Sequence, residues 1–273
     1  MDKGIFFEIT NACNHNCIHC CKNWEDNSEK RTADKAVLDK ILAFPKRHLT
    51  ISGGEPSLVK DKVMYLVERE KTKVIINTNM TNWTKEDITY LVGHGVEFNV
   101  SVVSLDRTAY KKITRADTYD MMFETLQEIP KNSFITIVVN RLNRNTIDYT
   151  VAVLILMGFT NIMVTPQKPT QDEHVDVDEI SRYAEKLHER YKNVANIMTQ
   201  GYCNVKFCDH LCNAGIGRFV IDTKQNVYPC APIHKECLLG TIDTPFAELE
   251  ENGRRFYLSY PEEQRHACKG FML

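Results

Sequence analysis

The stretch Ile5–Cys20 reads IFFEITNACNHNCIHC and joins a strand-forming segment directly to three closely spaced cysteines. A second stretch, Leu49–Pro56, repeats this arrangement with different residues: LTISGGEP is a strand-forming segment followed by two glycines, a glutamate and a proline. In both stretches, β-branched and aromatic residues give way at once to residues that favour tight loops. The rest of the chain extends the same strand-then-loop pattern.

Strand-forming and helix-forming segments alternate as far as residue 197. The predicted strands are Ile5–Ile9, Leu49–Ser52, Lys73–Asn77, Val96–Val103, Phe134–Val139 and Asn161–Thr165. Between them, apolar residues recur at helical spacing, as at Ile180, Ala184 and Leu187, and Thr84 is placed to begin a helix. This alternation predicts an α/β fold with parallel strands and right-handed crossovers. An open sheet and a partial barrel both satisfy it.

The chain changes character near residue 198, where we predict a boundary between domains 1–197 and 198–273. Six of the ten cysteines lie between Cys203 and Cys268. Phe219–Ile221 and Val227–Tyr228 flank a polar turn and predict a β-hairpin. The carboxy-terminal part is therefore expected to be a small hairpin-containing domain.

The amino-acid composition argues against several classes of function. The 34 basic and 36 acidic residues nearly balance, which gives no overall field for nucleic acid. The apolar run Val151–Met157 is far shorter than the roughly 20 residues that span a bilayer. Glu8 interrupts the amino-terminal apolar segment, so we expect no signal peptide and a cytoplasmic protein without nucleic-acid or membrane partners. Ten cysteines in such a protein indicate metal or thiol chemistry rather than disulfides.

Cys13, Cys17 and Cys20 have the spacing C-x3-C-x2-C. Three thiolates on one loop can bind three irons of a [4Fe–4S] cluster and leave the fourth iron open to a substrate or cofactor. Zinc is the competing metal, because His15, His19 and Cys21 can complete a tetrahedral set. If His15 is not a ligand, it is expected on the loop surface. Spacing alone leaves both metals open.

The cysteine triplet and the following Gly53-Gly54-Glu55-Pro56 together resemble the signature of the radical S-adenosylmethionine (radical SAM) enzymes. The resemblance implies a partial (β/α)6 TIM-like barrel in which a [4Fe–4S] cluster binds Cys13, Cys17 and Cys20. It also implies that S-adenosylmethionine chelates the open iron. Cofactor-binding residues would be His19 near the adenine, and Gly53, Gly54 and Glu55 around the ammonium group.

Further cofactor contacts follow from Ser101-Val102-Val103-Ser104-Leu105-Asp106 and Arg115. In the radical SAM family, a serine at the end of the fourth strand contacts the ribose and a later arginine contacts the carboxylate. By this resemblance Ser101 or Ser104 contacts the ribose and Arg115 the carboxylate. The alternative is that Asp106 caps a helix and Arg115 lies on the surface.

The site prediction also has a geometric basis, because ligand sites of parallel α/β folds form at the carboxyl ends of the strands. Six predicted strand ends carry polar or metal-binding residues: Cys13–Cys20, Gly53–Pro56, Asn77–Asn79, Ser101–Asp106, Asn140 and Thr165–Gln167. We expect these residues to lie close together around a single opening at the carboxyl ends of the strands.

The carboxy-terminal cysteines resemble the SPASM or twitch extension of radical SAM enzymes. The resemblance implies one auxiliary [4Fe–4S] cluster held by Cys208, Cys212, Cys230 and Cys268, with Cys237 or Cys203 as alternative fourth ligands. Cys237 is also a candidate catalytic residue, as a thiol that donates a hydrogen atom to a substrate radical. The turn glycine usual in this extension is replaced by Gln225-Asn226, where we expect Asn226 to supply any positive φ.

The resemblance implies an oxidoreductase that reductively cleaves S-adenosylmethionine to a 5'-deoxyadenosyl radical and removes hydrogen from a substrate C–H bond. An external one-electron donor such as flavodoxin or ferredoxin would reduce the cluster. The favoured substrate is a ribosomally made peptide, matured by a crosslink, a thioether or epimerisation. A twitch-type alcohol dehydrogenase of antibiotic biosynthesis is the alternative, and a non-catalytic zinc or iron–sulfur protein is the alternative from another class.

Overall fold

A computed structural model describes residues 3–20, 29–167, 176–198, 214–230 and 237–259. The strands are β1 (Gly4–Thr10), β2 (His48–Gly53), β3 (Lys73–Thr78), β4 (Glu97–Ser101), β5 (Phe134–Val139), β6 (Asn161–Pro166), β7 (Asn196–Met198), β8 (Arg218–Ile221), β9 (Asn226–Tyr228) and β10 (Gly240–Thr241). The α-helices are α1 (Lys35–Ala43), α2 (Lys60–Arg69), α3 (Lys85–Gly93), α4 (Arg107–Thr114), α5 (Tyr119–Glu128), α6 (Ile147–Leu156), α7 (Val177–Tyr191) and α8 (Phe246–Leu258). Two short 3-10 helices are η2 (Pro56–Val59) and η3 (Arg144–Thr146).

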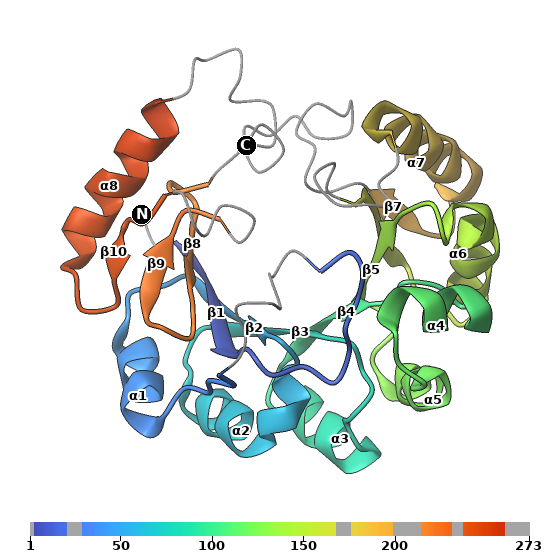
Figure 1. The fold of residues 1–273 in the computed structure, drawn as a ribbon. Helices are drawn as coiled ribbons and strands as arrows, with labels where there is room; N and C mark the ends of the chain where they lie inside the picture. Colours follow the sequence, from blue (N-terminus) through green and yellow to red (C-terminus); the bar gives the residue numbers. More distant parts are fainter. Residues whose placement is uncertain (1–2, 21–28, 168–175, 199–213, 231–236, 260–273) are drawn as a thin grey trace.

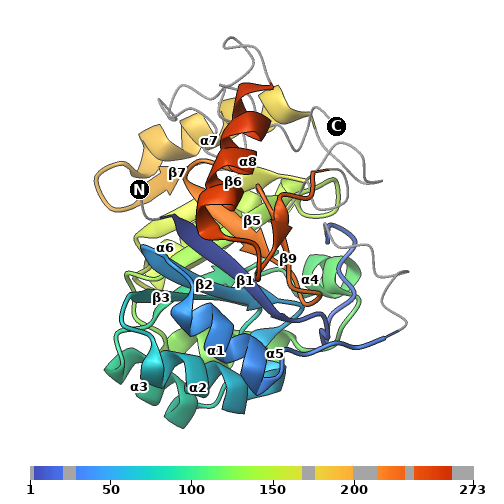
Figure 2. The same cartoon turned by 90° about the vertical axis from the view of Figure 1, so that its left-hand side faces the viewer.

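All described strands form one sheet in the order β10-β9-β8-β1-β2-β3-β4-β5-β6-β7. Strands β1 to β7 pair in parallel, β8 pairs in parallel with β1, and β9 and β10 complete the edge in antiparallel fashion. The sheet curves into an open barrel with the helices on its outer side (Figures 1 and 2). The structure therefore confirms the α/β fold and the partial barrel, and adds β7 to the six predicted strands.

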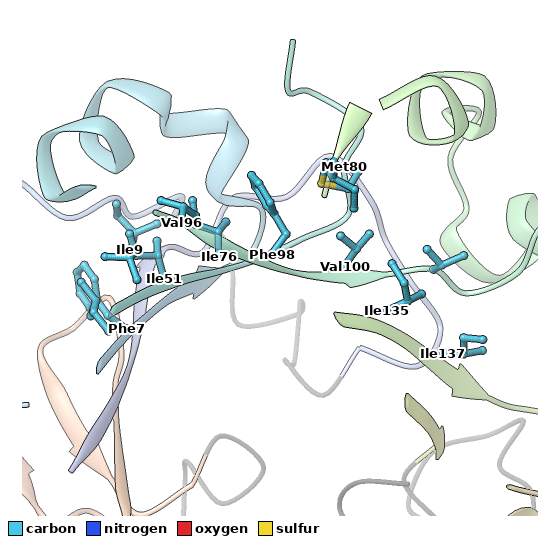
Figure 3. Close-up of a cluster of buried hydrophobic side chains, with 14 of the residues drawn as sticks. Phe7, Ile9, Ile51, Ile76, Met80, Val96, Phe98, Val100, Ile135 and Ile137 are labelled. Atoms are coloured by element: carbon cyan, nitrogen blue, oxygen red, sulfur yellow. The ribbon is translucent and has the colours of Figure 1, made fainter. Parts of the chain in front are cut away.

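The main hydrophobic core lies between the outer face of the sheet and the helices. Buried side chains from neighbouring strands, such as Phe7, Ile51 and Phe98, meet in this layer (Figure 3). Because side chains alternate across a strand, the residues between them point into the barrel. Several of these are polar: Asn99 donates to Asn77 at 3.0 Å and accepts from the Thr136 hydroxyl at 2.8 Å.

Helix α3 begins where the sequence predicts. The Thr84 hydroxyl accepts from the Asp87 backbone N–H, and the Asp87 carboxylate accepts in return from the Thr84 N–H, which completes a capping box. A capped start fixes the direction in which the helix returns to the sheet.

The predicted hairpin is confirmed, since β8 and β9 pair with Val220 opposite Tyr228. The expectation for its turn is wrong in one respect: Gln225 adopts the positive φ of 68°, and Asn226 already belongs to β9. The Asp222 carboxylate explains the shift, because it accepts from the Asn226 N–H and pulls that residue into the strand. Pairing of β8 with β1 makes the hairpin continuous with the barrel sheet. The domain boundary at residue 198 stays a prediction.

No helix in the described ranges combines the length and the apolar character needed to cross a membrane.

Candidate functional site

A cavity of about 330 Å³ opens at the carboxyl ends of the parallel strands. Its described walls bring together these predicted site residues: Cys13, Cys17, His19, Cys20, Gly53, Gly54, Glu55 and Ser101. They come from the loop after β1, from the end of β2 and the loop that follows it, and from the last residue of β4, which are far apart in sequence. The parallel register places those loops at the same edge of the sheet, so the cavity is a direct consequence of the topology.

Backbone hydrogen bonds join the cysteine loop to the glycine loop. The Gly54 N–H donates to the Thr10 carbonyl at 2.6 Å, and the Glu55 N–H donates to the Ala12 carbonyl at 2.8 Å. A side chain at residue 54 would place its Cβ 2.0 Å from the Ala12 oxygen, and one at Gly53, where φ is +144°, would lie 2.2 Å from the Thr10 oxygen. Glycine is required at both positions because the two backbones touch.

The far side of the cysteine loop rests on the end of α4. The Asn16 N–H donates to the Thr114 carbonyl and the Ile18 N–H to the Ile113 carbonyl, both at 3.0 Å. These last-turn carbonyls have no partner within their own helix, so the loop satisfies them. The cysteine loop is thus held between the glycine loop on one side and α4 on the other.

The three thiols fit a multi-iron cluster. All three line the same cavity and are partly exposed to it, and the His15 N–H donates to the Cys13 sulfur at 3.4 Å. Thiolates are the usual ligands of iron–sulfur clusters, and a [4Fe–4S] cube binds each thiolate at a separate iron. The chemistry of this donor set therefore fits such a cluster.

The Cys17 thiol is difficult to deprotonate at this site. Burial, together with the neighbouring Cys20 and Cys13 thiols, raises the pKa of the Cys17 thiol well above its ordinary value. The Arg115 guanidinium opposes this shift and lowers that pKa. Because iron binds the thiolate, a cluster bound at this loop would release protons and would have to supply the energy of deprotonation.

Glu55 is a buried carboxylate tied to β3 and η2. With 1% of its surface exposed, it accepts from the Asn79 N–H at 2.8 Å, the Thr78 hydroxyl at 2.7 Å and the Ser57 N–H at 3.0 Å. Burial raises the pKa of this carboxyl, and these three donors oppose the shift. The donors fix the side chain in one orientation at the cavity wall.

The expectation that His15 lies on the loop surface is wrong. Its ring is 8% exposed, lines the cavity, and has Nε2 2.8 Å from the Thr118 hydroxyl and 3.4 Å from the Tyr110 hydroxyl. Burial lowers the pKa of His15 to about 4, so the ring is neutral at pH 7. The reason is tertiary: the loop folds over α4 and α5, which carry those hydroxyls. Burial, with a smaller contribution from His15, likewise lowers the pKa of His19 to about 4.

The two serines after β4 separate in the structure. Ser101 is exposed on the cavity wall, whereas the buried Ser104 lies 3.1 Å from the Thr146 hydroxyl and accepts from the Asp106 N–H. Asp106 caps α4 by accepting from the Ala109 N–H at 2.8 Å. Arg115 is the exposed C-cap of the same helix. Only Ser101 of the two serines faces the cavity.

Two of the carboxy-terminal cysteines are described. Cys230 follows β9 and is 9% exposed, and Cys237 precedes β10 and packs against the core while partly exposed. Cys203, Cys208, Cys212 and Cys268 lie outside the described residues. The auxiliary cluster and the role of Cys237 stay predictions.

Sequence reasoning missed the contribution of α4 and of Val138. Val103 and Pro166 lie within strand-end segments that the sequence singled out, but neither was assigned a role. Tyr110 and Thr114 line the cavity from α4, and Val103, Val138 and Pro166 line it from the ends of β4, β5 and β6. Their residue types are those of an ordinary core, so no sequence signal separates them from it. The strand-end positions of Val103 and Pro166 were the one available clue.

Sequence relatives include probable GTP 3',8-cyclases. One from Saccharolobus islandicus (strain L.S.2.15 / Lassen #1) is 28% identical over 202 residues, which cover 68% of this chain and 65% of the relative. Another, from Sulfurisphaera tokodaii, is 27% identical over 136 residues, covering 45% and 41%. The chain therefore spans less than two thirds of the length of these relatives.

Solved structures share the fold across nearly the whole chain. Streptococcus suis SuiB bound to S-adenosylmethionine superposes with a TM-score of 0.72 at 15% identity, covering 91% of this chain and 65% of that one. Native anSMEcpe with bound AdoMet and Kp18Cys peptide gives 0.71 at 16% identity, covering 97% and 88%. The model of the Radical SAM superfamily matches residues 7–154, more than half of the sequence and all of the cysteine and glycine loops. The chain belongs to the radical SAM superfamily.

Proposed function

We propose that this chain reductively cleaves S-adenosylmethionine and uses the product to remove hydrogen from a substrate. The observation that carries the proposal is the direct backbone pairing of Gly54 and Glu55 with Thr10 and Ala12. This pairing holds three thiols and a buried carboxylate on one cavity wall. When bound there, the cluster and S-adenosylmethionine supply a 5'-deoxyadenosyl radical, the species that removes hydrogen from a C–H bond.

Each wall residue has a defined task in this proposal. Cys13, Cys17 and Cys20 bind the cluster. Glu55, held by three donors, attracts the ammonium group of the cofactor without having to reorient, which makes its charge effective.

The remaining proposed contacts to the cofactor lie around the opening of the cavity. Ser101, on the cavity wall, is proposed to contact the ribose, and His19, also on the wall, is proposed to lie near the adenine. Arg115, exposed at the end of α4, is proposed to contact the cofactor carboxylate. The apolar side chains of Val103 and Val138 keep water from the reacting carbon.

For the substrate we propose a ribosomally made peptide, joined or epimerised by the reaction. Amide and hydroxyl side chains that point into the barrel include Asn77, Asn99 and Thr136, and such groups pair well with peptide amides. The buried carboxyl of Glu8 lies on the same inward face. Two of the proteins that share this fold are named with bound peptides: SuiB with the precursor peptide SuiA, and anSMEcpe with Kp18Cys peptide.

A nucleotide substrate is the second candidate, and the sequence relatives support it. The probable GTP 3',8-cyclase from Saccharolobus islandicus matches at 28% identity over 202 residues. A small alcohol, oxidised as in antibiotic biosynthesis, is a third class that the same cofactor chemistry serves. The three substrate classes predict different results in the same assay of 5'-deoxyadenosine formation.

We also propose one auxiliary [4Fe–4S] cluster on Cys208, Cys212, Cys230 and Cys268, with an external flavodoxin or ferredoxin as electron donor. Cys237 is proposed as the thiol that returns a hydrogen atom to a substrate radical. Iron counting on a chain that lacks the amino-terminal triplet tests the first point: about four irons per chain are expected, and none would contradict it.

The deciding experiment is anaerobic reconstitution with iron and sulfide, followed by measurement of dithionite-dependent 5'-deoxyadenosine. The triple variant Cys13→Ala, Cys17→Ala, Cys20→Ala should form none, while the matched variant Cys21→Ala should retain the wild-type rate. Retained activity in the triple variant would refute the cluster assignment. Loss of activity in Cys21→Ala would favour a different ligand set.

The substrate class is tested in the same assay with named probes. Capped tripeptides of the form acetyl-Gly-Xaa-Gly-amide, GTP and 2-propanol are added separately. Stimulation of 5'-deoxyadenosine formation by peptides, with a mass change in the peptide, supports the first candidate. Stimulation by GTP or by the alcohol alone would replace it with the second or third.

A further inference from the structure

His15 lies between two of the cysteines in sequence and contacts the sulfur atoms of both. Its backbone N–H donates to the Cys13 sulfur at 3.4 Å, and its ring Nδ1 lies 3.9 Å from the Cys17 sulfur. Hydrogen bonds to sulfur are weaker and longer than those to oxygen, and both distances suit them. One residue is therefore placed to hydrogen-bond two of the three proposed cluster ligands.

The opposite side of the His15 ring is held by two hydroxyls. Nε2 lies 2.8 Å from the Thr118 hydroxyl, which in turn lies 3.0 Å from the Tyr110 hydroxyl. The Tyr110 ring also packs against the His15 ring edge to face, with the two planes at 87°. Tyr110 belongs to α4 and Thr118 is the N-cap of α5, so two helices fix the orientation of the ring.

This arrangement determines which ring nitrogen carries the proton when Cys17 is a thiolate. A thiolate only accepts hydrogen bonds, so a bond from the ring requires the proton on Nδ1. Nε2 then accepts from the Thr118 hydroxyl, and the Thr118 oxygen can accept from the Tyr110 hydroxyl. Every donor in the chain Tyr110–Thr118–His15–Cys17 then has an acceptor.

We propose that His15 hydrogen-bonds the cysteine sulfurs of the bound cluster and thereby raises its reduction potential, with Thr118 as the residue that positions the ring. Hydrogen bonds to the sulfurs are among the factors that set the potential of an iron–sulfur cluster. Reduction adds one negative charge to the cluster, and a donor directed at a sulfur stabilises that charge. The inference rests on the proposed function, because it requires a cluster bound to Cys13, Cys17 and Cys20.

Packing alone does not require histidine at this position. The side chain is buried, so leucine would fill much of the space and place more apolar surface out of water. The hydroxyl on one side of the ring and the sulfur on the other are what require two ring nitrogens. Because water is largely excluded, the hydrogen bond from the ring is electrostatically stronger than the same bond in solvent.

The test is a redox titration of the reconstituted protein, followed by electron paramagnetic resonance. The signal to follow is the one that changes when S-adenosylmethionine is added, since this identifies the cluster with an open iron. His15→Leu should make reduction about ten-fold less favourable, which is a fall of about 59 mV in midpoint potential for a one-electron couple. His15→Asn keeps an amide N–H near the position of Nδ1 and should restore most of the potential.

An unchanged or higher midpoint potential in His15→Leu would overturn the proposal. A higher potential is the result expected if water enters the vacated space, because water also stabilises the added negative charge. The sign of the shift therefore separates loss of the hydrogen bond from loss of packing.

Thr118→Val tests the positioning role without changing a group that contacts a cysteine. The midpoint potential should fall, by less than in His15→Leu, because Nε2 loses the hydroxyl that orients the ring. Thr108→Val, on the exposed face of α4, is the matched control and should leave the potential unchanged. If His15→Leu takes up no cluster, an unchanged potential in Thr118→Val overturns the proposal. Failure of the proposed function is separate, because the wild type would then show no S-adenosylmethionine-dependent signal and no reductant-dependent 5'-deoxyadenosine.

Discussion

Replacing Gly54 with alanine should disconnect the two loops that form the site. The new Cβ would lie 2.0 Å from the Ala12 oxygen, against an ordinary contact of 3.4–4 Å, so the loops must separate by more than about 1 Å. That separation breaks the bonds from Gly54 to Thr10 and from Glu55 to Ala12, whose net worth together is about 1–3 kcal/mol. Misplacement of catalytic groups by 1 Å can cost about 100-fold in rate.

We therefore expect Gly54→Ala to lose about 1–3 kcal/mol of unfolding free energy and about 100-fold in 5'-deoxyadenosine formation. The assays are denaturant unfolding of the cluster-free chain and reductant-dependent turnover after reconstitution. Gly93→Ala is the matched control, because a Cβ added there, near the end of α3, would meet nothing within 4 Å, and this variant should match the wild type in rate. Full activity and unchanged stability in Gly54→Ala would refute the claim that backbone contact between the loops builds the site.

Three further predictions concern the cavity wall and α4. Ser101→Ala should weaken S-adenosylmethionine binding in equilibrium dialysis and leave the free energy of unfolding unchanged. Ser104→Ala should lower the free energy of unfolding by about 1 kcal/mol and leave S-adenosylmethionine binding unchanged. The reverse pattern would contradict the placement of the two serines. Asp106→Ala should cost about 1 kcal/mol in thermal unfolding through loss of the bond from Ala109, and equal stability would rule out the cap. The pKa of His15 in the folded chain, about 4, lies below its ordinary value of 6.5. As the pH falls, the unfolded chain therefore binds this proton before the folded chain does. The free energy of unfolding should decrease by up to about 3 kcal/mol between pH 6.5 and pH 4. Urea unfolding of the cluster-free chain across this range should show a smaller loss in His15→Gln, and equal losses would contradict the burial of the ring.

Much of the barrel was predictable because its determinants are local. Strand-forming runs such as Phe134–Val139 and helix starts such as Thr84 depend on neighbouring residues, and the structure confirms both. The spacing of the cysteines and the glycine pair is also local, and it was sufficient to indicate the superfamily.

Contacts between distant segments were not predictable. His15 is buried because α4 and α5 bring Tyr110 and Thr118 to the cysteine loop, and nothing within the loop indicates this. The pairing of β8 with β1 joins residues more than 200 positions apart, so a strand that reads as part of a separate hairpin continues the barrel sheet.

The sequence by itself determined the order of strands and helices, the thiol triplet and the glycines, because backbone preference and ligand spacing are properties of short segments. Only the tertiary structure decided which serine after β4 faces the cavity, why residues 53 and 54 must be glycine, and that the His15 ring lies beside the Cys17 sulfur. Those properties depend on which backbone or side chain lies within a few ångströms, and that is fixed by the packing of segments remote in the chain.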